Sequence, residues 1–270
     1  MASNFNARDA AAYERSMGRW SRLLAPGFLR FAAIGAAARV LDVGCGTGSL
    51  LAALAETDRG AELHGIDASG IYATAAASRF AADGRVQVRQ GDAEALPYAD
   101  GTFDAALSQL VLQFVSAPAT ALAEMRRVVR PGGTVAAAVW NSGGGMPHQR
   151  MFWDTAAMLD PEAARLRART FSRPMTRRGD LASGFVAAGL AEVEEGMVTI
   201  CMEFADFDDF WQPIVGGEGT LGKYVGDLPG PDRDRLADHL KSAFEAGADR
   251  KPSAFACTAA VCRGTVPHGP

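Results

Sequence analysis

The chain has 270 residues, of which 48% are hydrophobic and 21% charged, a balance typical of a globular protein with one large core. Its formal net charge of −4 argues against nucleic acid as the main partner, because phosphate binding needs a concentrated basic face. The sequence shows neither a signal-peptide core nor an apolar run of membrane-spanning length, so we expect a cytoplasmic protein without a membrane partner.

The first predicted segment covers residues 1–37, ahead of any strand. The stretches ARDAAAYERSMG and SRLLAPGFLRFAAI have the pattern of amphipathic helices, and we expect them to be interrupted near Gly18 and Pro26. The sheet predicted downstream does not require this segment. We therefore expect residues 1–37 to form a separate N-terminal helical segment.

Residues 38–140 alternate short apolar runs with helix-like stretches, and turn signals such as ADGT and RPGG separate them. Strands that alternate with helices imply parallel strands joined by crossovers, and hence a doubly wound α/β sheet. This part is the predicted cofactor-binding half. The strands are predicted at 39–43, 61–67, 86–92, 103–109 and 134–140.

Residues 141–270 follow a different pattern, in which helices predominate. Two late strands are predicted from AEVEEGMVTICMEF and SAFACTAAVCR. We expect a single domain, 1–270, whose acceptor-side half carries helical insertions after the fifth and sixth strands. The helices of this half are predicted at 151–160, 180–190, 207–215 and 233–247.

The stretch VLDVGCGTGSL places Gly44, Gly46 and Gly48 directly after the first predicted strand. In a doubly wound sheet this strand-to-helix turn is where ligands bind, and glycine lets the backbone approach them closely. The spacing is GxGxG, and Ser49 stands where a dinucleotide fingerprint needs glycine or alanine. This departure weakens an NAD interpretation without eliminating it.

Two acidic residues end the next two predicted strands. Asp67, at the end of GID, is placed to accept hydrogen bonds from both hydroxyls of a ribose, which NAD and S-adenosylmethionine share. Asp92, in QGDAEALPYADGTFD, is placed to accept a hydrogen bond from an adenine amino group, with Leu96 and Pro97 as apolar cover. Dehydrogenase sheets do not require this second acid, so the pair favours S-adenosylmethionine.

The motifs VLDVGCGTG, GID, GDAEALPYADGTFD, SQLVLQFV and RRVVRPGG, in this order, resemble those of the class I S-adenosylmethionine-dependent methyltransferases. The closer resemblance is to the small-molecule branch that includes the ubiquinone/menaquinone-biosynthesis methyltransferases. It extends from Tyr13 to about Val139 and is only architectural beyond. It implies a seven-stranded, mostly parallel sheet of order 3-2-1-4-5-7-6 with the seventh strand antiparallel.

The resemblance also implies roles for individual residues. The glycine loop would approach the methionine part and the sugar of the cofactor, and Asp67 would bind the ribose. Asp92 would bind the adenine edge. The N-terminal helical segment, 1–37, would form a lid that folds over the cofactor and brings Tyr13 near the transferred methyl group. The remaining positions carried over are Ala68 beside the adenine, Ala93 at the adenine edge and Gln109 at the methionine end.

The methionine end of S-adenosylmethionine carries a carboxylate, and the motifs above supply no cation for it. Arg19, in YERSMGRWSR, is the first candidate and Arg22 the second. The alternative is that SRLLAPGFLRFAAI packs on the sheet and its arginines face water.

The acceptor side gives weaker signals. His148, in the loop after the fifth predicted strand, is a candidate general base because its unperturbed pKa is about 6.5, with a surface histidine as the alternative. The segment after the fourth strand reads SQLVLQF, without the Asn/Asp-Pro-Pro-Tyr-like tetrapeptide of enzymes that methylate nucleobases or glutamine. A flipped-base substrate is therefore not expected. Four aromatic residues are candidates for lining an acceptor pocket: Phe207, Phe210, Trp211 and Tyr224. The first three have helical spacing, and their alternative is the core of the insertion.

A cluster of arginines lies in the second half of the chain. Such a cluster is typical of a solvated helix face and loop, and recognition of an anionic substrate is the alternative. Its members are Arg165, Arg167, Arg169, Arg173, Arg177 and Arg178.

We therefore predict an enzyme that transfers a methyl group from S-adenosylmethionine to an oxygen, nitrogen or carbon atom of a small-molecule acceptor. No metal site is predicted, because the four cysteines show no CxxC spacing. The inserted helices at 147–160 and 206–215 are expected to enclose the acceptor. Two alternatives remain, a non-catalytic S-adenosylmethionine-binding protein and a nicotinamide-dependent oxidoreductase, for which no catalytic Tyr/Lys or His/Asp set is found. The sequence specifies neither the acceptor nor the oligomeric state.

Overall fold

A computed structural model describes residues 9–35, 39–57, 60–216, 219–246 and 253–268. The predicted lid over 1–37 lies partly outside these ranges.

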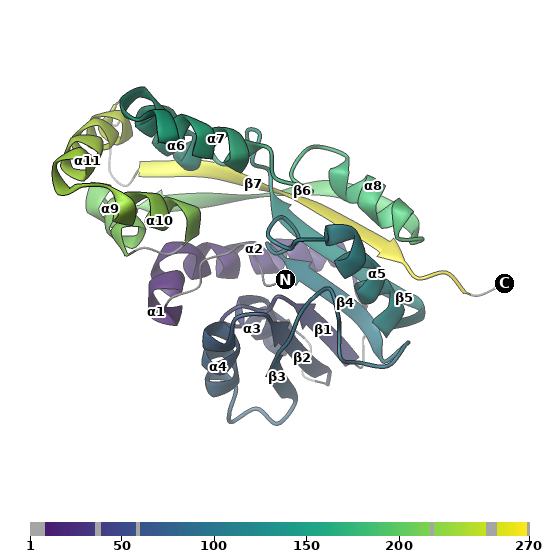
Figure 1. Cartoon of the computed structure of the whole chain (residues 1–270). Helices are drawn as coiled ribbons and strands as arrows, with labels where there is room; N and C mark the ends of the chain where they lie inside the picture. Colours follow the sequence, from purple (N-terminus) through teal and green to yellow (C-terminus); the bar gives the residue numbers. More distant parts are fainter. Residues whose placement is uncertain (1–8, 36–38, 58–59, 217–218, 247–252, 269–270) are drawn as a thin grey trace.

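One seven-stranded sheet forms the centre of the described structure, in the order β3-β2-β1-β4-β5-β7-β6 (Figure 1). Strands β1 to β5 run parallel, whereas β7 pairs antiparallel with both β5 and β6. The predicted fold class and strand order are confirmed. The strands are β1 (Arg39–Val43), β2 (Glu62–Asp67), β3 (Val86–Gln90), β4 (Phe103–Gln109), β5 (Val129–Trp140), β6 (Ala191–Phe204) and β7 (Ser253–Thr265).

Helices cover both faces of this sheet. Successive residues of β1 face opposite sides, so Val40 joins the core under α2 and α3 while Leu41 joins the core under α5 and α8. The last four residues of β1, Val40 to Val43, are buried, as is typical of a parallel strand covered on both faces. The covering helices are α2 (Arg19–Ala32), α3 (Ser49–Thr57), α4 (Gly70–Arg79), α5 (Pro118–Val128) and α8 (Asp180–Ala187).

Further helices gather at one end of the long strands β6 and β7 (Figure 1). Those after β5 are α6 (Pro147–Leu159) and α7 (Pro161–Phe171), and those after β6 are α9 (Phe207–Val215), α10 (Gly219–Asp227) and α11 (Gly230–Glu245). Helix α11 packs against α6 and α9 and buries aromatic side chains that include Phe210 and Phe244. The predicted insertions after the fifth and sixth strands are therefore present.

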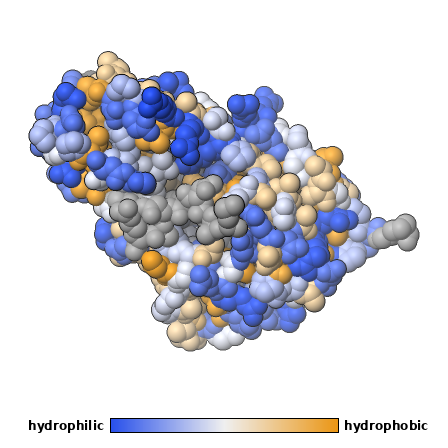
Figure 2. Space-filling model, in the orientation of Figure 1, coloured by the Kyte–Doolittle hydropathy of each residue, from blue (hydrophilic) through white to orange (hydrophobic). Residues whose placement is uncertain are grey.

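The outer surface of this helical insertion is mostly hydrophilic in Figure 2, with hydrophobic residues scattered between the charged ones. The apolar faces of its helices thus turn inward. None of the helices in the described ranges has the length and apolar character needed to cross a bilayer.

The N-terminal segment is one unbroken helical stretch, which passes from α1 (Ala10–Tyr13) through a π-helical turn (Glu14–Gly18) into α2. The interruption predicted near Pro26 is therefore wrong, whereas near Gly18 the α-helix gives way to the π-helical turn without a break in the helical stretch. Proline inside a helix removes one backbone hydrogen bond. Here the neighbouring residues of α2 are buried against the sheet, with Phe28 fully inaccessible, and this burial offsets the loss.

Candidate active site

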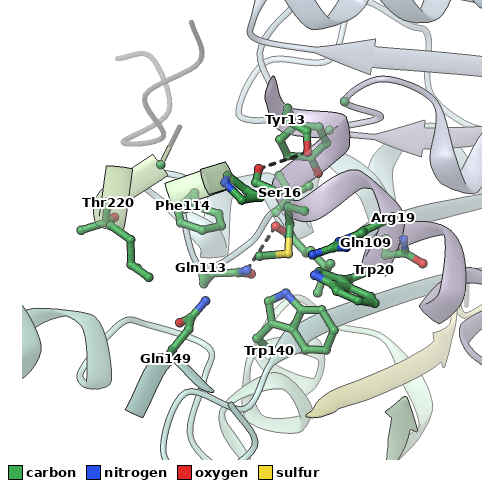
Figure 3. A pocket seen from close by; sticks show the side chains of 18 of the residues that line it. Tyr13, Ser16, Arg19, Trp20, Gln109, Gln113, Phe114, Trp140, Gln149 and Thr220 are labelled. Atoms are coloured by element: carbon green, nitrogen blue, oxygen red, sulfur yellow. Dashed lines mark hydrogen bonds between the residues drawn. The ribbon is translucent and has the colours of Figure 1, made fainter. Parts of the chain in front are cut away.

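A cavity of about 440 Å³ opens where β1, β2, β4 and β5 end (Figure 3). Its wall combines residues of the N-terminal segment, the loops after these strands, and helices α6, α9 and α10. The volume is typical of small-molecule sites, which span roughly 300–1,000 Å³. The cavity lies at the carboxyl ends of the parallel strands, where a doubly wound sheet binds its ligands.

The glycine loop between β1 and α3 forms one wall of the cavity. Gly44, Gly46 and Gly48 have φ values of +76°, +54° and +87°, a left-handed region in which glycine avoids the strain of a side chain. Gly44 and Gly46 line the cavity. A Cβ on Gly48 would lie 2.6 Å from the Phe80 ring, so Gly48 packs against the end of α4 rather than lining the cavity.

Asp67 ends β2 beside this loop and also lines the cavity. Its carboxylate accepts hydrogen bonds from the backbone N–H groups of Gly46 and Ser69, each at 2.8 Å. Burial raises the pKa of the Asp67 carboxyl, and the two backbone N–H groups partly oppose that shift. Because a carboxylate has about four acceptor sites, Asp67 can still accept hydrogen bonds from a diol. Ala68 borders the cavity next to it.

Asp92 and Ala93 do not reach the cavity wall. The Asp92 carboxylate accepts a hydrogen bond from the Glu94 backbone N–H at 2.9 Å and so stabilises the turn after β3. Ala93 is buried in the core beneath this turn. The structure therefore brings Gly44, Gly46 and Asp67 together at the cavity and leaves the β3 turn behind them.

Two glutamines and a tryptophan present unpaired polar atoms around the cavity. Gln109 donates from Nε2 to the Ser21 carbonyl at 3.0 Å, and Gln113 donates to the Leu110 carbonyl at 3.1 Å. Among the described residues, Oε1 of each glutamine and Nε1 of Trp140 are buried without a hydrogen-bond partner. Buried polar atoms in proteins are almost always satisfied, so these three indicate a polar ligand. Sequence reasoning missed Trp140, which is the last residue of β5 and follows the apolar run VAAAV.

The N-terminal segment borders the cavity through Tyr13 and Arg19 (Figure 3). The Tyr13 ring packs 4.9 Å from that of Tyr72, and its hydroxyl lies 3.5 Å from Ser21 Oγ. Burial raises the pKa of the Tyr13 hydroxyl.

Arg19 lines the cavity, but its guanidinium already has a partner. Nη1 donates to Asp209 Oδ1 at 2.7 Å and Nη2 donates to the Asp209 carbonyl at 3.2 Å. The Arg19 Nε atom is buried and has no acceptor in the described part of the chain. Helix α2 does pack on the sheet, as the alternative interpretation required, while its first residue faces the cavity.

His148 lies in the first turn of α6, lines the cavity and is 6% exposed. The predicted loop position and the surface alternative are both wrong, because α6 begins at Pro147 and packs this turn against β7. The His148 Nδ1 atom lies 3.4 Å from Cys257 Sγ. Burial lowers the pKa of His148 to about 4, so its imidazole is neutral at neutral pH.

Asp42 is a further residue that sequence reasoning missed. It lies in β1 behind the glycine loop, is 1% exposed, and its two carboxyl oxygens have no partner among the described residues. Burial and then the neighbouring Asp67 charge hold the pKa of Asp42 well above its usual range. The available signal was one acidic residue inside the apolar run VLDVG.

This combination of strand order, glycine loop and cavity at the strand ends defines a Rossmann-like methyltransferase fold. A family model described as a methyltransferase domain matches residues 41–137. An uncharacterised 37.1 kDa transposon protein of Streptomyces fradiae is 33% identical over 209 residues, which are 74% of this chain and 56% of that protein. The malonyl-[acyl-carrier protein] O-methyltransferase of Pseudescherichia vulneris is 41% identical over 116 residues, or 43% and 44% of the two chains.

Among solved structures, the YcgJ protein of Bacillus subtilis superposes with a TM-score of 0.60 at 20% identity and covers 93% of this chain and 100% of its own. The chain thus carries a methyltransferase domain over residues 41–137, on the Rossmann-like fold of the class I S-adenosylmethionine-dependent methyltransferases, whose cofactor is S-adenosylmethionine. It spans about half the length of the curated relatives that it matches.

Proposed function

We propose that this protein transfers a methyl group from S-adenosylmethionine to an oxygen, nitrogen or carbon atom of a small-molecule acceptor. The observation that carries the proposal is the continuity of the cavity from the glycine loop and Asp67 to helices α6, α9 and α10. One enclosure of this kind lets cofactor and acceptor meet in a fixed orientation, which supplies much of the acceleration of a bimolecular reaction.

The sheet end of the cavity fits the cofactor. Among the described residues, the nearest neighbour of a Cβ on Gly46 would be Tyr13 at 3.9 Å, so these residues leave room for a ligand in front of this glycine. Asp67 would accept the ribose hydroxyls, with Ala68 bordering the adenine. Gln109, with its unpaired Oε1, would face the methionine end. Arg19, whose Nε has no acceptor among the described residues, would face the methionine carboxylate, and Tyr13 would close the site near the methyl group.

Three predicted residues would act from behind the cavity wall. Gly48 would keep the loop close to α4, where a side chain has no room. Asp92 and Ala93 would shape the turn that flanks the adenine. None of the three lines the cavity.

The insertion end would hold the acceptor. Phe114, Phe210, Ile214 and Leu221 give this end apolar surface, while Gln113 and Gln149 offer hydrogen bonds. Helices α6 and α9 form a roof over it, and a roof of this kind would exclude water from the reaction. The open space beneath the roof argues against the alternative of a non-catalytic cofactor-binding protein.

When bound, S-adenosylmethionine supplies a methyl group on a positively charged sulfur, which makes that group strongly electrophilic. His148 is the candidate base that the roof offers to the cavity, but with a pKa of about 4 its imidazole accepts protons weakly at neutral pH. The proposal therefore relies on an acceptor that is already nucleophilic and is held in line by the cavity wall. His148 would contact it as a neutral hydrogen-bonding group.

Release of S-adenosylhomocysteine tests the proposal. The full chain is incubated with S-adenosylmethionine and a panel of small metabolites, and the released S-adenosylhomocysteine is quantified. At least one acceptor should give turnover, and Gly46→Ala should abolish it. Binding of S-adenosylmethionine without turnover on any acceptor would instead favour the non-catalytic alternative. Calorimetric titration with NAD should show no binding, whereas tight NAD binding would favour an oxidoreductase.

A further inference from the structure

The six arginines between 165 and 178 occupy different environments in the structure. Arg165 forms an ion pair with Glu162 at 2.9 Å, and Arg167 pairs with Asp154. Three others, Arg169, Arg177 and Arg178, are exposed. Arg173 differs from all of these, because it is half-buried and lines the cavity.

At the cavity, the Arg173 guanidinium contacts two neutral side chains, Thr220 and Phe114. Its Nη2 atom donates to Thr220 Oγ1 at 2.6 Å, and its guanidinium lies 4.6 Å from the centre of the Phe114 ring. Within the described ranges it forms no ion pair with an acidic residue. The other arginine on the cavity wall, Arg19, is neutralised by Asp209 at 2.7 Å.

A half-buried cation without a counter-charge is costly, because the protein replaces only part of its hydration. Burial and the neighbouring Arg169 charge both lower the pKa of Arg173, yet a guanidinium remains charged in proteins. It has five N–H donors, and one of its hydrogen bonds goes to a hydroxyl group. The remaining donors retain the geometry that binds a carboxylate or phosphate with two hydrogen bonds.

We propose that Arg173 forms an anion-binding subsite at the acceptor end of the cavity, so that the methyl acceptor carries a carboxylate or phosphate group. This inference rests on the proposed methyl transfer and narrows its substrate class. The same end of the cavity is lined by apolar residues, among them Phe114 and Ile214, so the rest of the acceptor should be apolar.

The position of Arg173 distinguishes this subsite from the cofactor's own carboxylate site. Its two partners, Phe114 and Thr220, lie across the cavity from Arg19 and Trp20 in Figure 3. The first turn of α10, which contains Thr220, borders the cavity too, and the positive end of its helix dipole adds to the attraction for an anion. Arg19 and Arg173 therefore serve opposite ends of the cavity.

Matched pairs of anionic and neutral probes test the subsite by calorimetric titration of the full chain. The pairs are octanoate with octanamide, benzoate with benzamide, and hexyl phosphate with 1-hexanol. The native protein should bind the anionic member of at least one pair about tenfold or more tightly. The carboxylate and phosphate pairs together identify which anion the subsite takes.

Arg173→Gln should remove this preference, and Arg173→Lys should keep part of it, because lysine retains the charge without the fork of donors. Arg177→Gln is the matched control, since it removes the same charge from an exposed position off the cavity wall and should keep the full preference. Equal affinity of the native protein for both members of every pair, or a preference that survives in Arg173→Gln, overturns the inference. If Arg173→Gln does not fold, a full preference in Arg173→Lys also overturns it.

Each titration is run with and without S-adenosylhomocysteine, and the affinity for S-adenosylhomocysteine is measured separately. A native protein that does not bind S-adenosylhomocysteine contradicts the proposed function. Intact S-adenosylhomocysteine binding without any anion preference contradicts the Arg173 subsite alone.

Discussion

The Asp67→Ala substitution gives the most direct test of the cofactor end. The carboxylate lies at the cavity and keeps acceptor capacity beyond its two hydrogen bonds to the Gly46 and Ser69 backbone. Loss of charge-assisted hydrogen bonds to two ribose hydroxyls should cost about 1.5–3 kcal/mol, or roughly 10- to 150-fold in the dissociation constant. Calorimetric titration with S-adenosylhomocysteine measures this change.

The same substitution also affects the fold, because it removes the acceptor of two backbone N–H groups. A donor left unsatisfied costs about 1–3 kcal/mol of stability, so the titration is done below the thermal transition of the variant. Asp100→Ala is the control, since it removes a carboxylate whose side chain is 80% exposed and lies off the cavity wall. A folded Asp67→Ala protein with native affinity would refute the role of Asp67.

Three other predictions address the loop, the N-terminal segment and the buried histidine. Gly46→Ala should lose about 1–2 kcal/mol of stability, because alanine is strained at a left-handed φ, and should bind S-adenosylhomocysteine at least tenfold more weakly. Gly35→Ala is the control, since Gly35 also has a left-handed φ, +64°, but has no described neighbour near its Cβ position, so it should lose only stability. Equal affinity of the two variants for S-adenosylhomocysteine would contradict this prediction. Arg19→Ala should weaken S-adenosylmethionine at least tenfold and leave adenosine, which lacks the carboxylate, nearly unchanged; equal loss of both ligands would count against it. The pKa of His148 is about 4 in the folded protein and about 6.5 in the unfolded chain, so the unfolded chain binds more protons between pH 6.5 and pH 4. The free energy of unfolding should therefore fall by up to about 3 kcal/mol as the pH drops through this range. Urea titrations should show that the free energy of unfolding depends less steeply on pH in His148→Asn than in the native protein. An equal pH dependence in the two proteins would rule out His148 as its source.

Local pattern predicted the sheet because each strand carries its own signal. RVLDV and FDAALSQ are apolar runs bounded by turn residues, and they match β1 and β4 residue for residue. The order of the strands came from the resemblance, since pairing in a parallel sheet depends on contacts that no single segment encodes. The same limit explains the error at Pro26, where the helix continues because its neighbours are buried by tertiary packing.

In the candidate site too, the residues with a local signal were predictable and those whose chemistry depends on tertiary packing were not. Gly44, Gly46 and Asp67 were predictable because a turn conformation and a strand end are local features. His148 and Asp42 were not placed correctly, because burial decides their chemistry and burial depends on the whole fold. In Arg173, the absence of an acidic partner in the described residues is likewise a property of the assembled cavity and has no signature in an arginine-rich stretch.

Arg19 combines a predicted contact with the cofactor and an ion pair that the sequence did not predict. Its partner Asp209 is 190 positions away, so no local pattern could have predicted the ion pair between the N-terminal segment and α9. The pair uses the two terminal nitrogens, and Nε stays buried without an acceptor in the part of the chain that the structure describes. Because a buried donor without an acceptor is costly, the same guanidinium that ties the N-terminal segment to the roof still favours a carboxylate beside it. On the proposed function, the ion pair would hold this donor in place for the cofactor's carboxylate, and the contrast in affinity between S-adenosylmethionine and adenosine measures that contribution.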